Sequence, residues 1–148
     1  MIVLDTNVIS ELMRAAPDPL VVAWVAAQPR SELYTTRINH AEILAGIAGM
    51  PAGRRRTNLS DLAEAIFEID FAGRILPFGR AATARYAEIV EPRRAAGRAT
   101  DGNDALIAAI ALGASAVVAT RDIGGFDACG LELINPWAPP KPSPSAPN

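Results

Sequence analysis

The sequence is marked by short, continuous apolar runs that alternate with segments of helical periodicity. The first run, residues 2–4, contains no polar residue, as is typical of a strand buried on both faces of a sheet. Further strand-like runs occur at residues 33–36, 74–77, 115–119 and 131–134. Short strands that alternate with helices predict an α/β fold with a mostly parallel sheet, in which ligands bind beyond the carboxyl ends of the strands.

Helical segments fill most of the intervals between these strands. We expect a short helix after Asp5, capped by Thr6 or Asn7, and a second helix over residues 18–28. Because Thr6 and Asn7 are the better caps, Asp5 is left for another role. A third helix is expected to begin with Asn39 as its N-cap. Longer helices are expected over residues 54–67, 80–94 and 104–112.

Length and composition are consistent with one domain. The chain has 148 residues, half of them hydrophobic, so a single core can form. We assign residues 1–137 to this domain and residues 138–148, which are rich in proline and serine, to a disordered or extended tail. The net charge of −2 argues against a polybasic tail but not against a local patch that binds nucleic acid. Without a signal peptide or a membrane-spanning run, we expect a soluble cytoplasmic protein.

Acidic residues lie where strands end and where helices begin. Asp5 directly follows the first apolar run, and Asp122 follows the run at residues 115–119. Glu42 and Asp104 are expected in the first turns of two helices. If both helices start at the carboxyl edge of the sheet, all four acids converge there.

Carboxylates that converge at one edge favour a divalent cation. Carboxylates a few ångströms apart resist ionising together, and a bound cation removes that repulsion. Ligands that are all oxygen suit Mg²⁺, or Mn²⁺, rather than zinc. The chain has one histidine and one cysteine, which gives little support to a zinc site. The pattern therefore favours metal-assisted hydrolysis of a phosphate ester.

The same acids also have structural interpretations. Glu42 stands three residues after Asn39 and can therefore close a capping box. Asp101 can cap the helix whose first turn holds Asp104, and we favour Asp104 as the metal ligand. Asp122 can shape the glycine-containing loop that follows it rather than bind metal.

Four segments resemble the acidic motifs of the PIN-domain family, in particular the VapC- and FitB-like toxins of bacterial toxin–antitoxin pairs. They are IVLDTNVISE at residues 2–11, NHAEILAGI at 39–47, DALIAAIA at 104–111 and VVATRD at 117–122, with Phe126 behind the last. The ending Asn135-Pro136-Trp137 also resembles FitB-like members. The similarity covers residues 1–137, in order and at the spacing of the family.

The resemblance implies a three-layer PIN-like fold with a central sheet flanked by helices, and a toxin that is a Mg²⁺- or Mn²⁺-dependent ribonuclease. By match to the acidic motifs, the catalytic and metal-binding residues would be Asp5, Glu42, Asp104 and Asp122. Polar positions that support the site match Thr6, Asn7 and Thr120. The resemblance also implies homodimers and a cognate antitoxin protein that blocks the site, in a hetero-oligomer with the toxin.

RNA contacts and competing functions are further hypotheses. Arg98 and Arg121 lie near the acidic motifs in sequence and are the predicted contacts to RNA phosphates. One alternative function is a phosphatase with Asp5 as covalent nucleophile, although Asn7 stands where a second aspartate is expected in one large phosphatase family. The other alternative is a catalytically inactive PIN-like module that binds RNA or protein.

Overall fold

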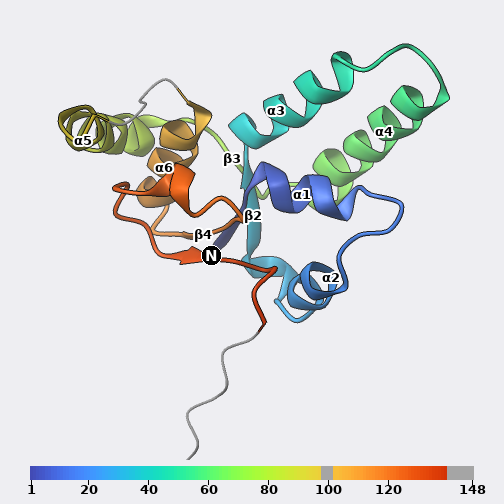
Figure 1. Ribbon diagram of the computed structural model, residues 1–148, viewed down its shortest axis with the longest axis horizontal. Helices are drawn as coiled ribbons and strands as arrows, with labels where there is room; N and C mark the ends of the chain where they lie inside the picture. Colours follow the sequence, from blue (N-terminus) through green and yellow to red (C-terminus); the bar gives the residue numbers. More distant parts are fainter. Residues whose placement is uncertain (98–101, 140–148) are drawn as a thin grey trace, which may run out of the picture.

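A five-stranded parallel sheet forms the centre of the fold (Figure 1). The computed structural model describes residues 1–97 and 102–139. The strands are β1 (Ile2–Leu4), β2 (Leu33–Thr36), β3 (Ile75–Leu76), β4 (Val117–Ala119) and β5 (Leu133–Ile134). Their order is β3-β2-β1-β4-β5, and each pair of neighbours is parallel. The predicted α/β fold with a mostly parallel sheet is confirmed.

The described residues include six α-helices. They are α1 (Thr6–Leu12), α2 (Pro19–Ala26), α3 (Arg37–Ala48), α4 (Arg54–Ala65), α5 (Arg80–Ala95) and α6 (Asn103–Gly113). Helices α5 and α6 pack together on one side of the sheet, whereas α1, α2 and α4 lie on the other (Figure 1). In this part of the chain, none of the helices has the length and apolar character needed to cross a lipid bilayer.

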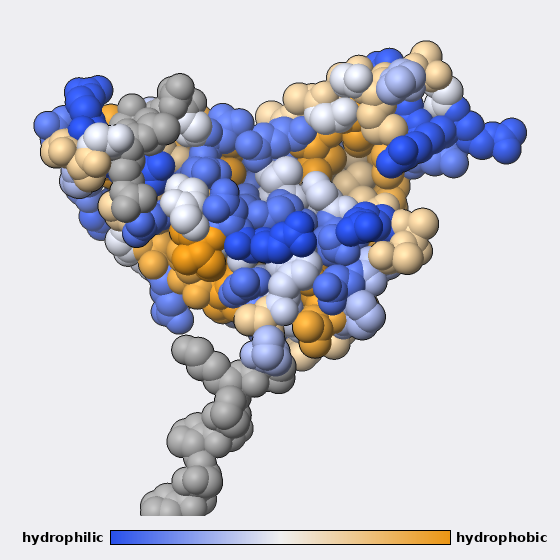
Figure 2. Space-filling model, viewed as in Figure 1, coloured by the Kyte–Doolittle hydropathy of each residue, from blue (hydrophilic) through white to orange (hydrophobic). Residues whose placement is uncertain are grey.

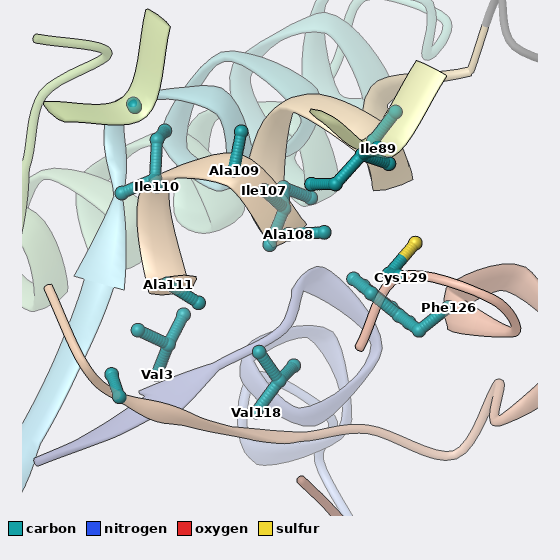
Figure 3. Packing of buried hydrophobic residues seen from close by; sticks show 13 residues of the cluster. Val3, Ile89, Ile107, Ala108, Ala109, Ile110, Ala111, Val118, Phe126 and Cys129 are labelled. Atoms are coloured by element: carbon teal, nitrogen blue, oxygen red, sulfur yellow. The ribbon is translucent and has the colours of Figure 1, made fainter. Parts of the chain in front are cut away.

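Alternating side chains of β1 divide the core into two clusters. Val3 belongs to the cluster that includes Ile107 of α6 and Phe126 (Figure 3). Leu4 belongs to the opposite cluster, together with Val8 of α1. This period of two means that helices cover both faces of the strand. The three-layer arrangement implied by the family resemblance is thereby confirmed.

Helix α3 begins earlier than predicted. Its N-cap is Thr36, the last residue of β2, and Asn39 completes the capping box from position N3. Thr36 takes this position because the strand already holds its backbone extended, at φ −121° and ψ 161°, and because its hydroxyl accepts from the Asn39 N–H at 3.1 Å. Glu42 therefore lies in the second turn of α3, and the interpretation that it closes a capping box is wrong.

This extended conformation of Thr36 is the one that N-cap residues adopt. A strand that ends in a hydroxyl residue therefore supplies a ready cap for the helix that follows it. The consequence for the fold is that α3 starts directly at the carboxyl edge of the sheet.

Helix α1 likewise begins directly after its strand. Its N-cap is Asp5, whose carboxylate accepts from the Thr6 N–H, so the prediction that Thr6 or Asn7 caps this helix is wrong. The main chain of Asp5 still belongs to the sheet, because its N–H donates to the Ala119 carbonyl at 3.0 Å. A residue that ends a strand and caps a helix places its carboxylate at the carboxyl edge.

Helix α6 starts at the same edge although no strand directly precedes it. Its N-cap is Gly102 and Asp104 lies in its first turn. Because a short connection leads from α6 into β4, the helix runs against the strand and its N-terminus lies at the carboxyl edge. Asp101, the predicted cap, and Arg98 lie outside the described residues. So does most of the predicted tail, and the division at residues 138–148 stays a prediction.

Candidate active site

A hollow of about 590 Å³ opens at the carboxyl edge of the sheet. All four predicted acids line it, although they come from the end of β1, from α3, from α6 and from the loop after β4. The lining residues are Asp5, Thr6, Asn7, Ser10, Glu11, Arg14, Glu42, Asp104, Arg121 and Asp122. The acids thus share one hollow, whereas their roles in catalysis and metal binding stay predictions.

The Asp5 carboxylate is buried and accepts four hydrogen bonds. Its Oδ1 accepts from the Thr6 N–H at 2.8 Å and from the side-chain amide of Asn39 at 3.1 Å. Its Oδ2 accepts from the Asn7 amide at 2.9 Å and from the Thr120 hydroxyl at 2.8 Å. A carboxylate has about four acceptor positions, so donors from the chain fill those of Asp5.

Burial dominates the electrostatics of Asp5. Desolvation raises the pKa of this carboxyl to about 6, although the hydrogen bonds from Thr120 and Thr6 oppose the shift. The charges of Asp104 and Glu42 raise the pKa further. Negative charge at this position is therefore costly, and a bound cation would relieve that cost.

Asn39 links the end of β1 to the start of α3. Its amide nitrogen donates to Asp5 and to the Thr6 hydroxyl, the latter at 3.0 Å. Its Oδ1 accepts from the N–H of Thr36 at 3.2 Å and from the hydroxyl of the same residue at 2.6 Å. A single buried side chain thus closes the capping box and orients the Asp5 carboxylate.

Glu42 reaches the hollow from the second turn of α3. One of its oxygens accepts from the Thr6 hydroxyl, and the other accepts from the side-chain amide of Asn103 at 2.9 Å. Both contacts join Glu42 to other elements rather than to the first turn of its own helix. The carboxylate therefore bridges α1 and α6 at the hollow.

Asp104 and Asp122 approach each other across Gly125. A β-carbon built on Gly125 would lie 2.5 Å from Oδ2 of Asp104 and 2.8 Å from Oδ2 of Asp122. The other oxygen of Asp122 accepts from the Gly125 N–H at 3.0 Å. The missing side chain leaves a space between two carboxylate oxygens that any larger residue would fill. Asp122 therefore both shapes its loop and presents an oxygen to Asp104.

Arg93 holds this loop from behind. It is 7% exposed, and its Nη1 donates to the Gly125 carbonyl at 3.0 Å and to the Asp127 carbonyl at 2.9 Å. Burial, followed by the charge of Asp122, raises the pKa of Asp104, and the positive charge of Arg93 opposes that rise. Arg93 thus ties α5 to the loop that seats Gly125 against the two carboxylates.

The donor set of the hollow suits a hard divalent cation. The acids supply only oxygen ligands, and Gly125 leaves room beside two of them. Across the described ranges, no group of three or more histidine, cysteine, aspartate or glutamate side chains is assembled so that it could hold a metal ion by itself. Mg²⁺ commonly takes one or two carboxylates and completes its shell with waters and substrate phosphates. The residues present therefore fit Mg²⁺ or Mn²⁺ bound with water, rather than an ion enclosed by protein.

Sequence reasoning found some of these contacts and missed others. The residues predicted to support the site all donate to Asp5, namely Thr6, Asn7 and Thr120. The roles of Asn39, Asn103 and Gly125 at the site were not predicted. Asn39 and Asn103 each stand within three residues of a predicted acid, which is a signal that could have indicated them. No local pattern separates Gly125 from the adjacent Gly124.

The sequence and the fold both match known proteins. The profile of the PIN domain family matches residues 2–129. The chain is 46% identical to VapC ribonuclease Y4jK of Sinorhizobium fredii over 139 residues, which are 94% of this chain and 99% of that protein. It is 40% identical to toxin FitB of Neisseria gonorrhoeae over 137 residues, 93% of this chain and 99% of that protein. In a solved structure of FitAB bound to a DNA fragment, one chain matches with a TM-score of 0.86 at 39% identity, over 95% of this chain and 99% of that chain.

Proposed function

Because this chain belongs to the PIN-domain family, we propose that it is a metal-dependent ribonuclease and the toxin of a toxin–antitoxin pair. The observation that carries the proposal is the arrangement of four acids around one hollow, namely Asp5, Glu42, Asp104 and Asp122. The similarity to a VapC ribonuclease and to toxin FitB, over nearly the full length of each, supports a nuclease that acts as a toxin. The proposed substrate is the phosphodiester backbone of RNA.

The four acids would hold Mg²⁺ or Mn²⁺. When bound, such an ion lowers the pKa of a water molecule and offsets the negative charge of a phosphate under attack. Asp104 and Asp122 supply oxygens beside Gly125, and Glu42 adds a carboxylate between α1 and α6. Asp5 supplies a negative charge whose position is fixed by its four hydrogen bonds.

The supporting residues keep the charge of Asp5 in one place. Thr120 and Asn39 are fully buried, and each donates to a different oxygen of Asp5. A network that is already formed before substrate arrives needs no reorganisation during the reaction. The role of these residues is therefore orientation rather than direct contact with RNA.

The same network argues against a covalent phosphatase. Asp5 is 5% exposed, and both of its carboxylate oxygens accept hydrogen bonds from the chain. A nucleophilic carboxylate needs an oxygen free to reach phosphorus. No observation favours this second function, and the inactive-module alternative is separated from a nuclease by the experiment below.

A larger cavity beside the hollow is the proposed docking groove of the cognate antitoxin. Its volume is about 920 Å³, and it shares Thr6 and Glu42 with the acidic hollow. Figure 2 shows hydrophobic residues between α3 and α4. Ile47 and Leu59 are among the residues that line the groove. A partner seated there would cover Glu42 and block the site. Substitution Leu59→Asp should then relieve inhibition by the cognate antitoxin, and unrelieved inhibition would contradict this assignment.

We further propose that the chain forms homodimers and, with its antitoxin, a hetero-oligomer. The proposed place of action is the cytoplasm, where its RNA substrate is found. Light scattering on the purified chain, alone and with the antitoxin, measures both assemblies. A monomer at micromolar concentration would contradict the proposed homodimer.

The direct test is cleavage of total RNA by the purified chain. With Mg²⁺ or Mn²⁺ the wild type should cut RNA, and with EDTA it should not. Asp5→Asn and Asp104→Asn should each lower cleavage by about 100-fold or more, since each removes a charge that the cation needs. The matched control is Glu64→Gln, which neutralises an exposed acid of α4 and should leave cleavage unchanged.

Two outcomes would contradict the proposal. Cleavage that persists in EDTA and in both aspartate variants would point to a contaminating nuclease or to a mechanism without metal. A folded wild type that binds RNA yet never cuts it would instead support the inactive module. Mapping of the cleaved ends identifies the RNA target when cleavage is present.

A further inference from the structure

Two arginines line the same hollow as the four acids. They are Arg14, just after α1, and Arg121, just after β4, and both are exposed to solvent. Of these two, sequence reasoning selected Arg121 as an RNA contact and did not select Arg14. Positive charge beside acidic metal ligands is the arrangement that a nucleic-acid backbone requires, because each bound nucleotide brings a further phosphate.

Glu11 holds Arg14 at the hollow. Glu11 is 6% exposed, and its Oε2 lies 3.2 Å from Nη1 of Arg14. Its Oε1 accepts from the Asp18 N–H at 2.8 Å, which anchors the carboxylate to the start of α2. The Asp18 N–H, then Arg14 and the charge of Arg121, lower the pKa of Glu11. The buried, ionised Glu11 thus attracts both exposed arginines electrostatically.

Arg121 is held from another direction by an aromatic ring. Its guanidinium carbon lies 4.8 Å from the centroid of the Trp137 ring. Its backbone N–H donates at 3.2 Å to Asn7, which in turn donates to Asp5. The arginine is therefore fixed to the acidic network at its backbone and to a ring at its side chain. Within residues 1–97 and 102–139, no salt bridge occupies the Arg121 guanidinium.

We propose that Arg14 and Arg121 form a phosphate-binding subsite, which holds an RNA backbone phosphate next to the scissile one. Glu11 and Trp137 are positioning residues that orient the two guanidinium groups. The inference rests on the proposed function, because it takes RNA as the substrate. Guanidinium groups match the geometry of phosphate oxygens with two parallel N–H donors, which a lysine ammonium cannot do.

A structural role alone does not account for this arrangement. The contact between Arg14 and Glu11 stabilises little, since the arginine side chain is 65% exposed and such pairs contribute about 0–1 kcal/mol. Two arginines also share the single charge of Glu11. Both arginines line the hollow itself, where their guanidinium groups face an incoming substrate.

The salt dependence of RNA binding tests the subsite. Binding of a short fluorescein-labelled single-stranded RNA is measured by anisotropy in EDTA over a range of NaCl concentrations. Each phosphate contact contributes about −0.7 to the slope of log K against log salt for single strands. Arg14→Gln and Arg121→Gln should therefore each make the slope shallower by about 0.7, and the double variant by about 1.4. Arg121→Lys should keep the slope but weaken binding severalfold, because it keeps the charge and loses the paired donors.

A matched control separates this effect from the loss of any positive charge. Arg30 also pairs with an acid, Asp70 at 2.9 Å, and is 76% exposed. It precedes β2 and so lies at the amino edge of the sheet, away from the hollow. Arg30→Gln should leave the slope at the wild-type value. A slope that changes equally in Arg30→Gln and Arg121→Gln would overturn the subsite.

Cleavage kinetics with Mg²⁺ provide a second measurement, which would stay unchanged if Arg14 and Arg121 had only a structural role. Loss of a contact to a phosphate that does not react should raise KM severalfold and leave kcat nearly unchanged. Unchanged slopes and unchanged KM in both glutamine variants, at the wild-type melting temperature, would overturn the inference but not the proposed function. A wild type that neither binds nor cuts RNA would overturn both.

Discussion

The two halves of the candidate site are built by different physical means. The half around Asp5 is a hydrogen-bond network, in which a carboxylate that is 5% exposed accepts from four donors of the chain. The half around Asp104 and Asp122 is held by close packing against Gly125, with Arg93 securing the loop from behind. The network fixes one charge in place, whereas the packing leaves two carboxylate oxygens beside the position that a Gly125 side chain would fill.

This difference separates what substitutions should do in each half. Removing a donor from the network leaves buried polar groups without partners and should cost stability. Crowding the packed half should displace the carboxylates that face a ligand and should cost binding and catalysis. Measurements of both stability and activity on the same variants therefore test whether the two halves differ in this way.

The largest effect is expected at Gly125. A β-carbon there would lie 2.5 Å and 2.8 Å from two carboxylate oxygens, so Asp104 and Asp122 must move apart in Gly125→Ala. A displacement of about 1 Å at a reacting centre can cost about 100-fold, and we expect a loss of that size in kcat/KM. The affinity for Mg²⁺, measured by titration calorimetry, should fall in parallel, while the melting temperature changes little.

The adjacent residue, Gly124, provides a control in which the same substitution is made. A β-carbon on Gly124 would lie 3.7 Å from Asp122 Oδ1, which is ordinary van der Waals contact. Gly124→Ala should therefore keep near wild-type cleavage and Mg²⁺ affinity. Equal losses in the two alanine variants would mean that loop flexibility, rather than the position of the carboxylates, is what matters here.

The pH dependence of stability tests the network half. The folded pKa of Asp5 is about 6, above its ordinary value of 3.8, so the neutral form is favoured by folding. Its contribution to stability is fully present below about pH 3.8 and is lost as the pH rises through 6. Over this window the loss amounts to at most about 3 kcal/mol.

Urea unfolding in EDTA between about pH 4 and pH 8 measures this contribution. Asp5→Asn cannot ionise and should flatten the pH profile relative to the wild type. In the proposed site Mg²⁺ would bind the ionised carboxylate, so its stabilising effect on the wild type should grow as the pH rises through 6. Parallel pH profiles for the wild type and Asp5→Asn would show that Asp5 is not the group responsible.

Removal of one hydrogen-bond donor to Asp5 should lower the stability by less than ionisation of Asp5 does. Thr120 is 0% exposed; it donates to Asp5 and accepts from the Asp122 N–H at 3.0 Å. Thr120→Val keeps the shape and removes the hydroxyl, so we expect a loss of about 1–3 kcal/mol in the free energy of unfolding. In the control Thr83→Val, an exposed hydroxyl that donates to the Gly79 carbonyl is lost, and the change should stay within about 0.5 kcal/mol. Similar losses in both variants would contradict a network role for Thr120.

The two halves also differ in how far sequence could predict them. The position of Asp5 follows from a buried strand and from the rule that parallel strands share their carboxyl edge. Glu42 was placed at the right edge but in the wrong turn, because Thr36 and Asn39 form a capping box that begins three residues earlier than expected. The seating of Gly125 depends on how Arg93, distant in sequence, fixes its loop. Local patterns carry no information about such a tertiary contact.

The smallest effect on stability and cleavage is expected for substitution of Asn103. Its amide donates to Glu42 at 2.9 Å in an exposed contact that joins α6 to α3. Asn103→Ala should lower stability by less than about 0.5 kcal/mol and cleavage by only a few fold, since solvent can replace the lost donor.

The double variant Asn103→Ala/Thr120→Val shows whether the network around Asp5 and the contacts of Glu42 act separately. If the network around Asp5 and the contacts of Glu42 are independent, the two changes in unfolding free energy should add to within about 0.3–0.5 kcal/mol. The Thr6 hydroxyl is the physical route by which they could couple, because it accepts from Asn39 and donates to Glu42. A coupling energy of 1 kcal/mol or more would mean that the site is one network, and that only the packing at Gly125 stands apart from it.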